Sequence, residues 1–144
     1  MRYRDEPHLK YIRSLACVIC GDDTSVEACH IRFADASLVK ATGIAIKPDD
    51  YWVLPMCSKH HRLQHSGNER KFWNDAGIDA CLYALRLFSV SGDYEAGLAI
   101  LKAANHGLDR CEWKSGQTAM RLWKKQPRWS SGSVIMRVVK KLRK

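Results

Sequence analysis

Two short pairs of metal-binding side chains constrain this chain more than any other feature of its sequence. Cys17 and Cys20 are separated by two residues, as are Cys57 and His60, and residues 21 to 56 lie between the pairs. Zinc prefers thiolate and imidazole ligands in closed tetrahedral sites, and each pair supplies two of the four ligands. We therefore predict one structural Zn²⁺ ion bound by these four side chains. The alternative is a thiol redox pair, but the sequence lacks the thioredoxin-like βαβ pattern that such a pair needs.

Three further histidines extend this pattern. His61 and His65 are four residues apart, so on a helix they share one face. At 100° per residue, that face points about 90° away from the second zinc pair, and one helix can therefore present two neighbouring metal sites. His30 lies in a candidate strand. The alternative for His61 and His65 is a solvated surface pair, and for His30 it is a hydrogen-bonded structural histidine.

Local sequence signals predict an α+β chain. Asp5 and Pro7 are typical of the first turn of a helix, Pro55 is expected to stop a strand, and Gly77 argues against one continuous helix around it. Residues 33–50 show no clear period and are expected to form a long surface loop. The expected helices span residues 5–15, 57–65, 68–87 with a break at Gly77, 93–104 and 115–125, and the expected strands span 26–32 and 51–54.

The ordered combination of these features carries a family resemblance. Residues 17 to 65, about a third of the 144-residue chain, resemble the HNH superfamily with its ββα-metal fold. The run from Asp50 to His65, which contains Cys57-Ser-Lys-His60-His61-Arg-Leu-Gln-His65, is most similar to phage-encoded, RecA-dependent HNH nucleases and related uncharacterised phage proteins. The resemblance implies metal-dependent hydrolysis of DNA phosphodiester bonds, in phage recombination or DNA processing.

The resemblance also implies a role for each matching residue. His30 matches the general base, and Asp50 stands at or near the position of the asparagine that orients it. His61 and His65 match ligands of the catalytic divalent ion, Mg²⁺ or another. The four residues of the zinc set match the structural zinc ligands found in many members: Cys17, Cys20, Cys57 and His60.

One position departs from the family pattern. The residue before the base is usually a His or Asp that binds the catalytic metal, and here it is Cys29. A thiolate suits Zn²⁺ better than Mg²⁺. The site therefore uses two protein ligands and water, or prefers a softer ion, or Cys29 only fills the core. Asp49 is close enough in sequence to exchange roles with Asp50.

The net charge of +9 is concentrated near the C-terminus. The last 24 residues contain nine basic side chains and no acidic one, together with Trp123 and Trp129. Such a block predicts contact with DNA phosphates. The alternative is a solvated amphipathic helix whose tryptophans pack on the core. The candidate DNA-binding residues are Arg121, Lys124, Lys125, Arg128, Arg137, Lys140, Lys141, Arg143 and Lys144.

These observations combine into one expected organisation. A zinc-stapled ββα-metal core with an N-terminal helix occupies residues 1–80, and a mainly helical extension ending in the basic tail occupies residues 81–144. The expected partners are DNA and a recombinase filament, and no contact with a membrane is expected. The sequence predicts no particular oligomeric state. The expected location is the cytoplasm, that of a host bacterium if the protein is phage-encoded. The competing function is a non-catalytic, zinc-stabilised DNA-binding protein that assists recombination.

Overall fold

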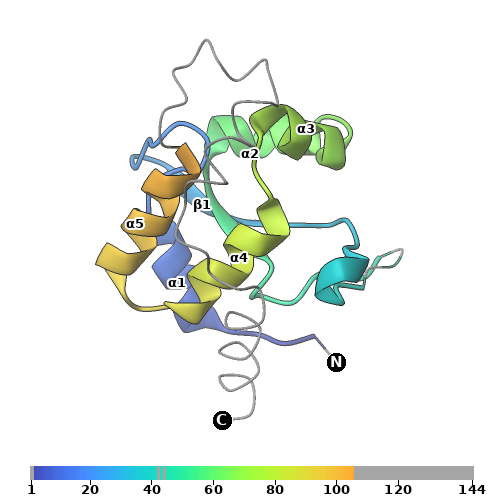
Figure 1. Ribbon diagram of the computed structural model, residues 1–144, viewed down its shortest axis with the longest axis horizontal. Coiled ribbons are helices and arrows are strands. Elements are labelled where there is room, and N and C mark those ends of the chain that lie inside the picture. Colours follow the sequence, from blue (N-terminus) through green and yellow to red (C-terminus); the bar gives the residue numbers. More distant parts are fainter. Residues whose placement is uncertain (1, 42, 44, 106–144) are drawn as a thin grey trace.

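The computed structural model describes residues 2–41, 43 and 45–105. Within these residues the chain is α+β, as expected, with five α-helices and a small sheet of two antiparallel strands. Figure 1 shows the elements in order: α1 (Glu6–Ser14), β1 (Val26–His30), the short 3₁₀-helix η1 (Ala36–Leu38), β2 (Val53–Cys57), α2 (Ser58–His65), α3 (Glu69–Ala76), α4 (Ala80–Ser89) and α5 (Tyr94–Asn105). The expected helix over residues 115–125 lies outside the described residues.

The helix boundaries follow from capping residues that the sequence displays. The side chain of Asp5 accepts a hydrogen bond from the backbone N–H of His8 at 2.9 Å and thereby caps α1. Gly77 ends α3 in the left-handed conformation, with φ of +66°. Asp79 then caps α4 by accepting a hydrogen bond from Leu82 at 3.1 Å. The break expected at Gly77 is therefore confirmed.

The second strand differs from the prediction because Pro55 lies inside it. β2 spans Val53–Cys57, and Pro55 pairs with Ala28 of β1. The carbonyl of Pro55 points away from β1 and accepts a hydrogen bond from the backbone N–H of Val18 at 2.8 Å. Pro55 therefore occupies a position that makes no hydrogen bond to β1, where its missing N–H removes nothing from the ladder. The prediction that Pro55 stops the strand at residue 54 was wrong.

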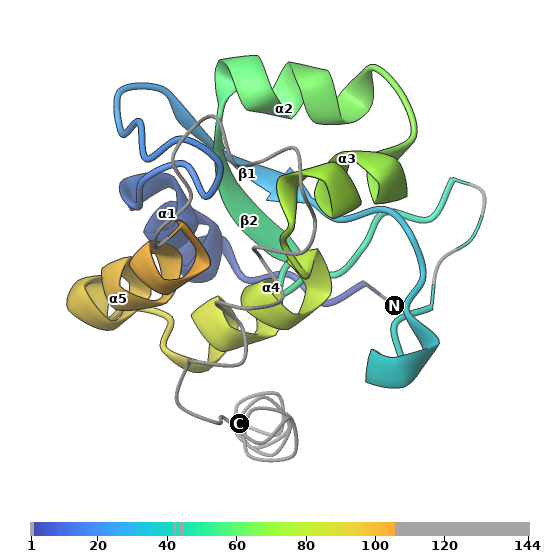
Figure 2. The same ribbon diagram turned by 45° about the horizontal axis from the view of Figure 1, so that its top comes forward.

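Helix α2 begins directly after β2 and runs back over the sheet. Figure 2 shows α2 along β1, with α3 beside it and α4 against the other side of β2. One hydrophobic core joins these elements, and its largest fully buried side chains include Trp73, Phe88 and Leu54. Residues of α4 and Leu101 of α5 belong to the same core. The division at residue 80 stays a prediction.

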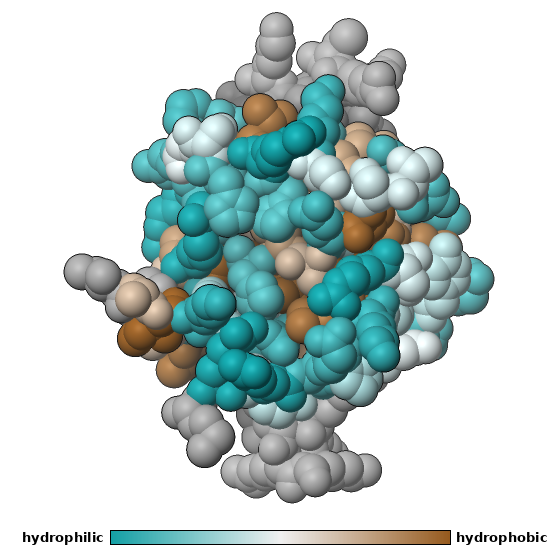
Figure 3. All heavy atoms as spheres, turned by 180° about the vertical axis from the view of Figure 1, so that it is seen from behind, coloured by the Kyte–Doolittle hydropathy of each residue, from teal (hydrophilic) through white to brown (hydrophobic). Residues whose placement is uncertain are grey.

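The surface of the described residues is mainly hydrophilic. Viewed from behind, hydrophilic side chains cover most of the face and apolar ones show in small separate patches (Figure 3). The two most exposed large hydrophobic side chains, Val39 and Ile46, lie in the loop between the strands. None of the helices that the structure describes combines the length and the apolar character needed to span a bilayer.

Candidate metal centre and histidine site

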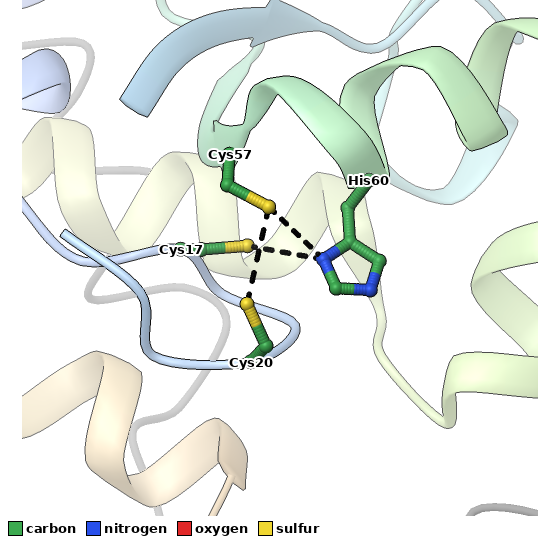
Figure 4. A group of neighbouring side chains, drawn as sticks. All are labelled: Cys17, Cys20, Cys57 and His60. Carbon is green, nitrogen blue, oxygen red and sulfur yellow. Dashed lines mark hydrogen bonds between the residues drawn. The ribbon is translucent and has the colours of Figure 1, made fainter. Parts of the chain in front are cut away.

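The four predicted zinc ligands converge on one point. Figure 4 shows Cys17 and Cys20 reaching from the loop after α1, and Cys57 and His60 reaching from the junction of β2 and α2. The ligand atoms of all four side chains lie within 4.8 Å of one another. Among the described residues this is the only such group of three or more metal-binding side chains.

The spacing inside this cluster suits a zinc ion. The distance from Nδ1 of His60 is 3.2 Å to the Cys57 sulfur and 3.8 Å to the Cys17 sulfur. The Cys20 and Cys57 sulfurs are 3.9 Å apart. Ligands at about 2.3 Å (sulfur) and about 2.0 Å (nitrogen) from a tetrahedral ion would be separated by about 3.5–3.8 Å. A disulfide would need about 2.05 Å, so the cluster is a Cys₃His set able to bind a metal ion such as zinc.

Short-range backbone structure positions each pair. The backbone N–H of Gly21 donates to the carbonyl of Cys17 at 2.8 Å, and Gly21 has a φ of +74°, which a side chain would disfavour. The hydrogen bond between Val18 and Pro55 ties this loop to β2. On the other side, Cys57 is the N-cap of α2 and His60 follows within one turn. Each pair is therefore formed locally, and the hairpin brings the two together.

The charge environment differs between the two buried thiols of the cluster. Burial raises the pKa of the Cys17 thiol to about 12. Burial acts in the same direction on Cys57, but the backbone N–H of His60 and the neighbouring thiols hold its pKa below the ordinary value. A thiolate at a helix N-terminus is a good metal ligand. Of these two thiols, Cys57 is therefore the one that ionises more readily.

A second constellation surrounds His30 at the end of β1. Nε2 of His30 lies 3.0 Å from Oδ1 of Asp50, and Nη2 of Arg2 lies 2.5 Å from the same oxygen. The other oxygen of Asp50 accepts the backbone N–H of Asp5 at 2.9 Å. Asp49 instead accepts hydrogen bonds from Tyr3 and Tyr51. The structure thus places Asp50, and not Asp49, against His30.

Two contacts act on the tautomer of His30. Asp50 favours the form whose Nε2–H donates to its carboxylate and whose Nδ1 keeps the lone pair, whereas Nη2 of Arg2, 3.2 Å from the same Nε2, can only donate and favours the opposite form. Burial lowers the pKa of His30, an effect that the hydrogen bond to Asp50 only partly offsets. Burial acts to raise the pKa of Asp50, yet its three hydrogen bonds hold that pKa below the ordinary value. The arrangement favours a neutral imidazole beside an ionised carboxylate.

His61 and His65 lie together on α2, as their spacing predicted. Their Nε2 atoms are 3.0 Å apart, within hydrogen-bond distance of each other. Two nitrogens at about 2.0–2.1 Å from one octahedral ion, at a right angle, would be separated by about 3 Å, so the same spacing is compatible with a shared ion. Nδ1 of His61 contacts the carboxylate of Glu27 on β1. A metal-binding histidine commonly donates its second N–H to a carboxylate in this way, which aims the other nitrogen at the ion.

Cys29 is placed differently from these histidines. Its side chain is fully buried, its sulfur contacts the carbonyl of His30 at 3.9 Å, and burial raises the pKa of its thiol. It does not join a ligand group with His61 and His65 in the described part of the chain. These observations favour Cys29 as a core residue. The nine basic residues of the tail lie outside the described residues.

The sequence reasoning missed two partners of the histidines. Arg2 was part of an unremarkable charged N-terminus, and Glu27 was one residue of a strand with no assigned role. No sequence signal places Glu27 beside His61, because the contact spans 34 positions and depends on how α2 lies along β1.

Comparison with protein-family models, with curated proteins and with solved structures gives no match to this chain. Function is therefore inferred from the residues themselves: the Cys₃His cluster, the His30–Asp50 pair and the His61–His65 pair.

Proposed function

We propose that this chain is a metal-dependent endonuclease of the HNH superfamily that hydrolyses DNA phosphodiester bonds. The observation that carries the proposal is the hydrogen bond between His30 and Asp50, at the end of a strand that contacts the helix with His61 and His65 on one face. The charge of His61 acts on the pKa of His30, which supports their closeness. The Cys₃His cluster supports a structural zinc site next to them.

In this proposal each residue has a defined task. Nδ1 of His30 accepts a proton from the attacking water, a role that suits an imidazole kept neutral by burial. Asp50 holds the ring in that tautomer and stabilises the imidazolium that forms. His61 and His65 would hold the divalent ion, with His61 aimed by Glu27. An ion bound there would supply positive charge to the phosphate and to the leaving oxygen.

The test is a plasmid-nicking assay with Mg²⁺, Mn²⁺ and chelator in parallel lanes. We expect nicking by the wild-type chain with a divalent ion, and a loss of about 100-fold or more in the His30→Ala variant. The same substitution at His106, which is not among the residues assigned to the site, is the matched control. A His30→Ala variant with an intact metal content and the wild-type rate would remove His30 from the mechanism.

Two observations favour a second candidate, a non-catalytic DNA-binding protein stabilised by zinc. Cys29 is buried where the family pattern has a third ligand of the catalytic ion, and His61 and His65 form no larger ligand group in the described residues. This candidate predicts DNA binding with no nicking under any metal. The same assay, run beside a binding measurement, separates the two.

A further inference from the structure

An arginine that follows β1 is anchored on a buried carboxylate. The backbone N–H of Arg32 donates to both carboxylate oxygens of Glu69, each at 3.2 Å, and Nε of Arg32 lies 3.5 Å from Oε2. The side chain of Glu69 is only 8% exposed, whereas that of Arg32 is 46% exposed. One end of the arginine is thus fixed in the interior while much of its side chain reaches solvent.

The same carboxylate ties this arginine to the helix that carries the histidines. Oε1 of Glu69 accepts a hydrogen bond from Nε2 of Gln64 at 2.6 Å and a longer one from the indole of Trp73 at 3.4 Å. Gln64 is fully buried on α2 and directly precedes His65. Glu69 therefore connects the segment after β1 with the end of α2.

A second arginine contacts the other part of the site. Nη2 of Arg2 lies 3.2 Å from Nε2 of His30 and 2.5 Å from Oδ1 of Asp50. Two guanidinium groups are thus each paired with a largely buried carboxylate that also contacts a histidine or the residue before one.

We propose that Arg32 binds the DNA phosphate on which the histidine site acts, an inference that rests on the proposed nuclease function. A guanidinium presents its N–H donors in a planar fork that matches the geometry of phosphate oxygens, and 46% of the Arg32 side chain is exposed to solvent. Because Glu69 also holds Nε of Arg32 at 3.5 Å, less side-chain freedom is lost when the phosphate binds. Arg32 is the more exposed of these two arginines, with 46% of its side chain exposed against 25% for Arg2.

The experiment compares Arg32→Gln and Arg32→Lys in the full chain with Arg13→Gln as the matched control. Arg13 has a similar exposure, 44%, and pairs with Glu6 on α1. The backbone contacts of Arg32 with Glu69 do not need its side chain, and metal content and thermal melting confirm that each variant folds. The substrates are a plasmid for cleavage and a duplex oligonucleotide for binding in the His30→Ala background.

We expect Arg32→Gln to lower kcat by about 100-fold, as loss of one transition-state donor commonly does, with a smaller change in KM. Arg32→Lys should restore part of the rate because it keeps the charge but not the fork. The slope of log K against log salt should fall by about one in Arg32→Gln and stay unchanged in Arg13→Gln. Wild-type kcat and an unchanged slope in Arg32→Gln would overturn the proposal.

The two proposals fail in different ways. If the wild-type chain cuts and Arg32→Gln cuts equally well, Arg32 is wrong and the nuclease function stands. If the wild-type chain binds DNA but never cuts, the nuclease function is wrong, and the salt slope alone decides whether Arg32 contacts a phosphate. If it does not bind DNA, both proposals are wrong.

Discussion

Loss of the metal from the Cys₃His cluster should destabilise the whole fold, and Cys20→Ser is the best single substitution to show it. Cys20 is the most exposed cysteine of the cluster, so a change of sulfur to oxygen there disturbs packing least. At Cys57, by contrast, a serine would stand at the N-cap of α2 and add a capping group. A stability loss in Cys20→Ser therefore reports the metal rather than the core.

The expected magnitude follows from the loop that the metal closes. Linking Cys20 to Cys57 closes a loop of about 40 residues, and in the chain-entropy model such a cross-link stabilises the folded state by about 4 kcal/mol. Domains of this size have a total stability of about 5–15 kcal/mol. The variant should therefore melt about 10–15 °C below the wild-type chain.

The assay combines metal content with thermal melting of the zinc-loaded chain, with and without chelator. Cys111→Ser makes the same chemical change outside the four ligands and should keep one zinc per chain. Chelator should lower the melting temperature of the wild-type chain toward that of Cys20→Ser. A wild-type chain that binds no metal, or whose melting temperature does not respond to chelator, would refute the structural zinc site.

Three further predictions concern packing, pH and the tail. Gly97→Ala would place a Cβ 2.2 Å from the hydroxyl oxygen of Tyr11, so urea denaturation should show a loss of about 1–3 kcal/mol despite the better helix propensity of alanine. Gly67→Ala, whose Cβ would meet no atom of the described chain within 4 Å, should change stability by less than about 0.5 kcal/mol. Because burial lowers the pKa of His30, the neutral imidazole persists to lower pH. The cleavage rate should therefore fall on acidification with a midpoint below about pH 6.5. A midpoint above that pH would argue against His30 as the base. Removal of residues 121–144 should weaken DNA binding and flatten its salt dependence, and an unchanged slope would place the tail away from DNA.

The cluster and the helix starts were predictable because their signals are local in the sequence. Two ligands separated by two residues can bind the same zinc ion, so each pair supplies half of the site. An Asp side chain that accepts the backbone N–H three residues later caps the start of a helix. The placement of Pro55 was not predictable in this way. A strand can contain proline only where the backbone N–H is not needed for pairing. Whether position 55 meets this condition depends on the register of β1 against β2.

The partners of the histidines were hidden for the same reason. Glu27 meets His61 across 34 positions of sequence, and Glu69 meets Arg32 across 37. Neither pair follows from spacing or composition. Both contacts depend on the tertiary packing of α2 along β1 and of α3 beside α2.

The metal cluster and the histidine site are therefore coupled through one helix. Cys57 and His60 anchor the first turn of α2, and the register of Val26 against Cys57 sets where that turn stands over β1. This placement brings His61, four residues after Cys57, into contact with Glu27. A metal ion bound by the cluster holds the beginning of α2, and so it also holds the contact that aims His61. The cluster then stabilises the fold and, within the proposed function, positions a ligand of the second ion.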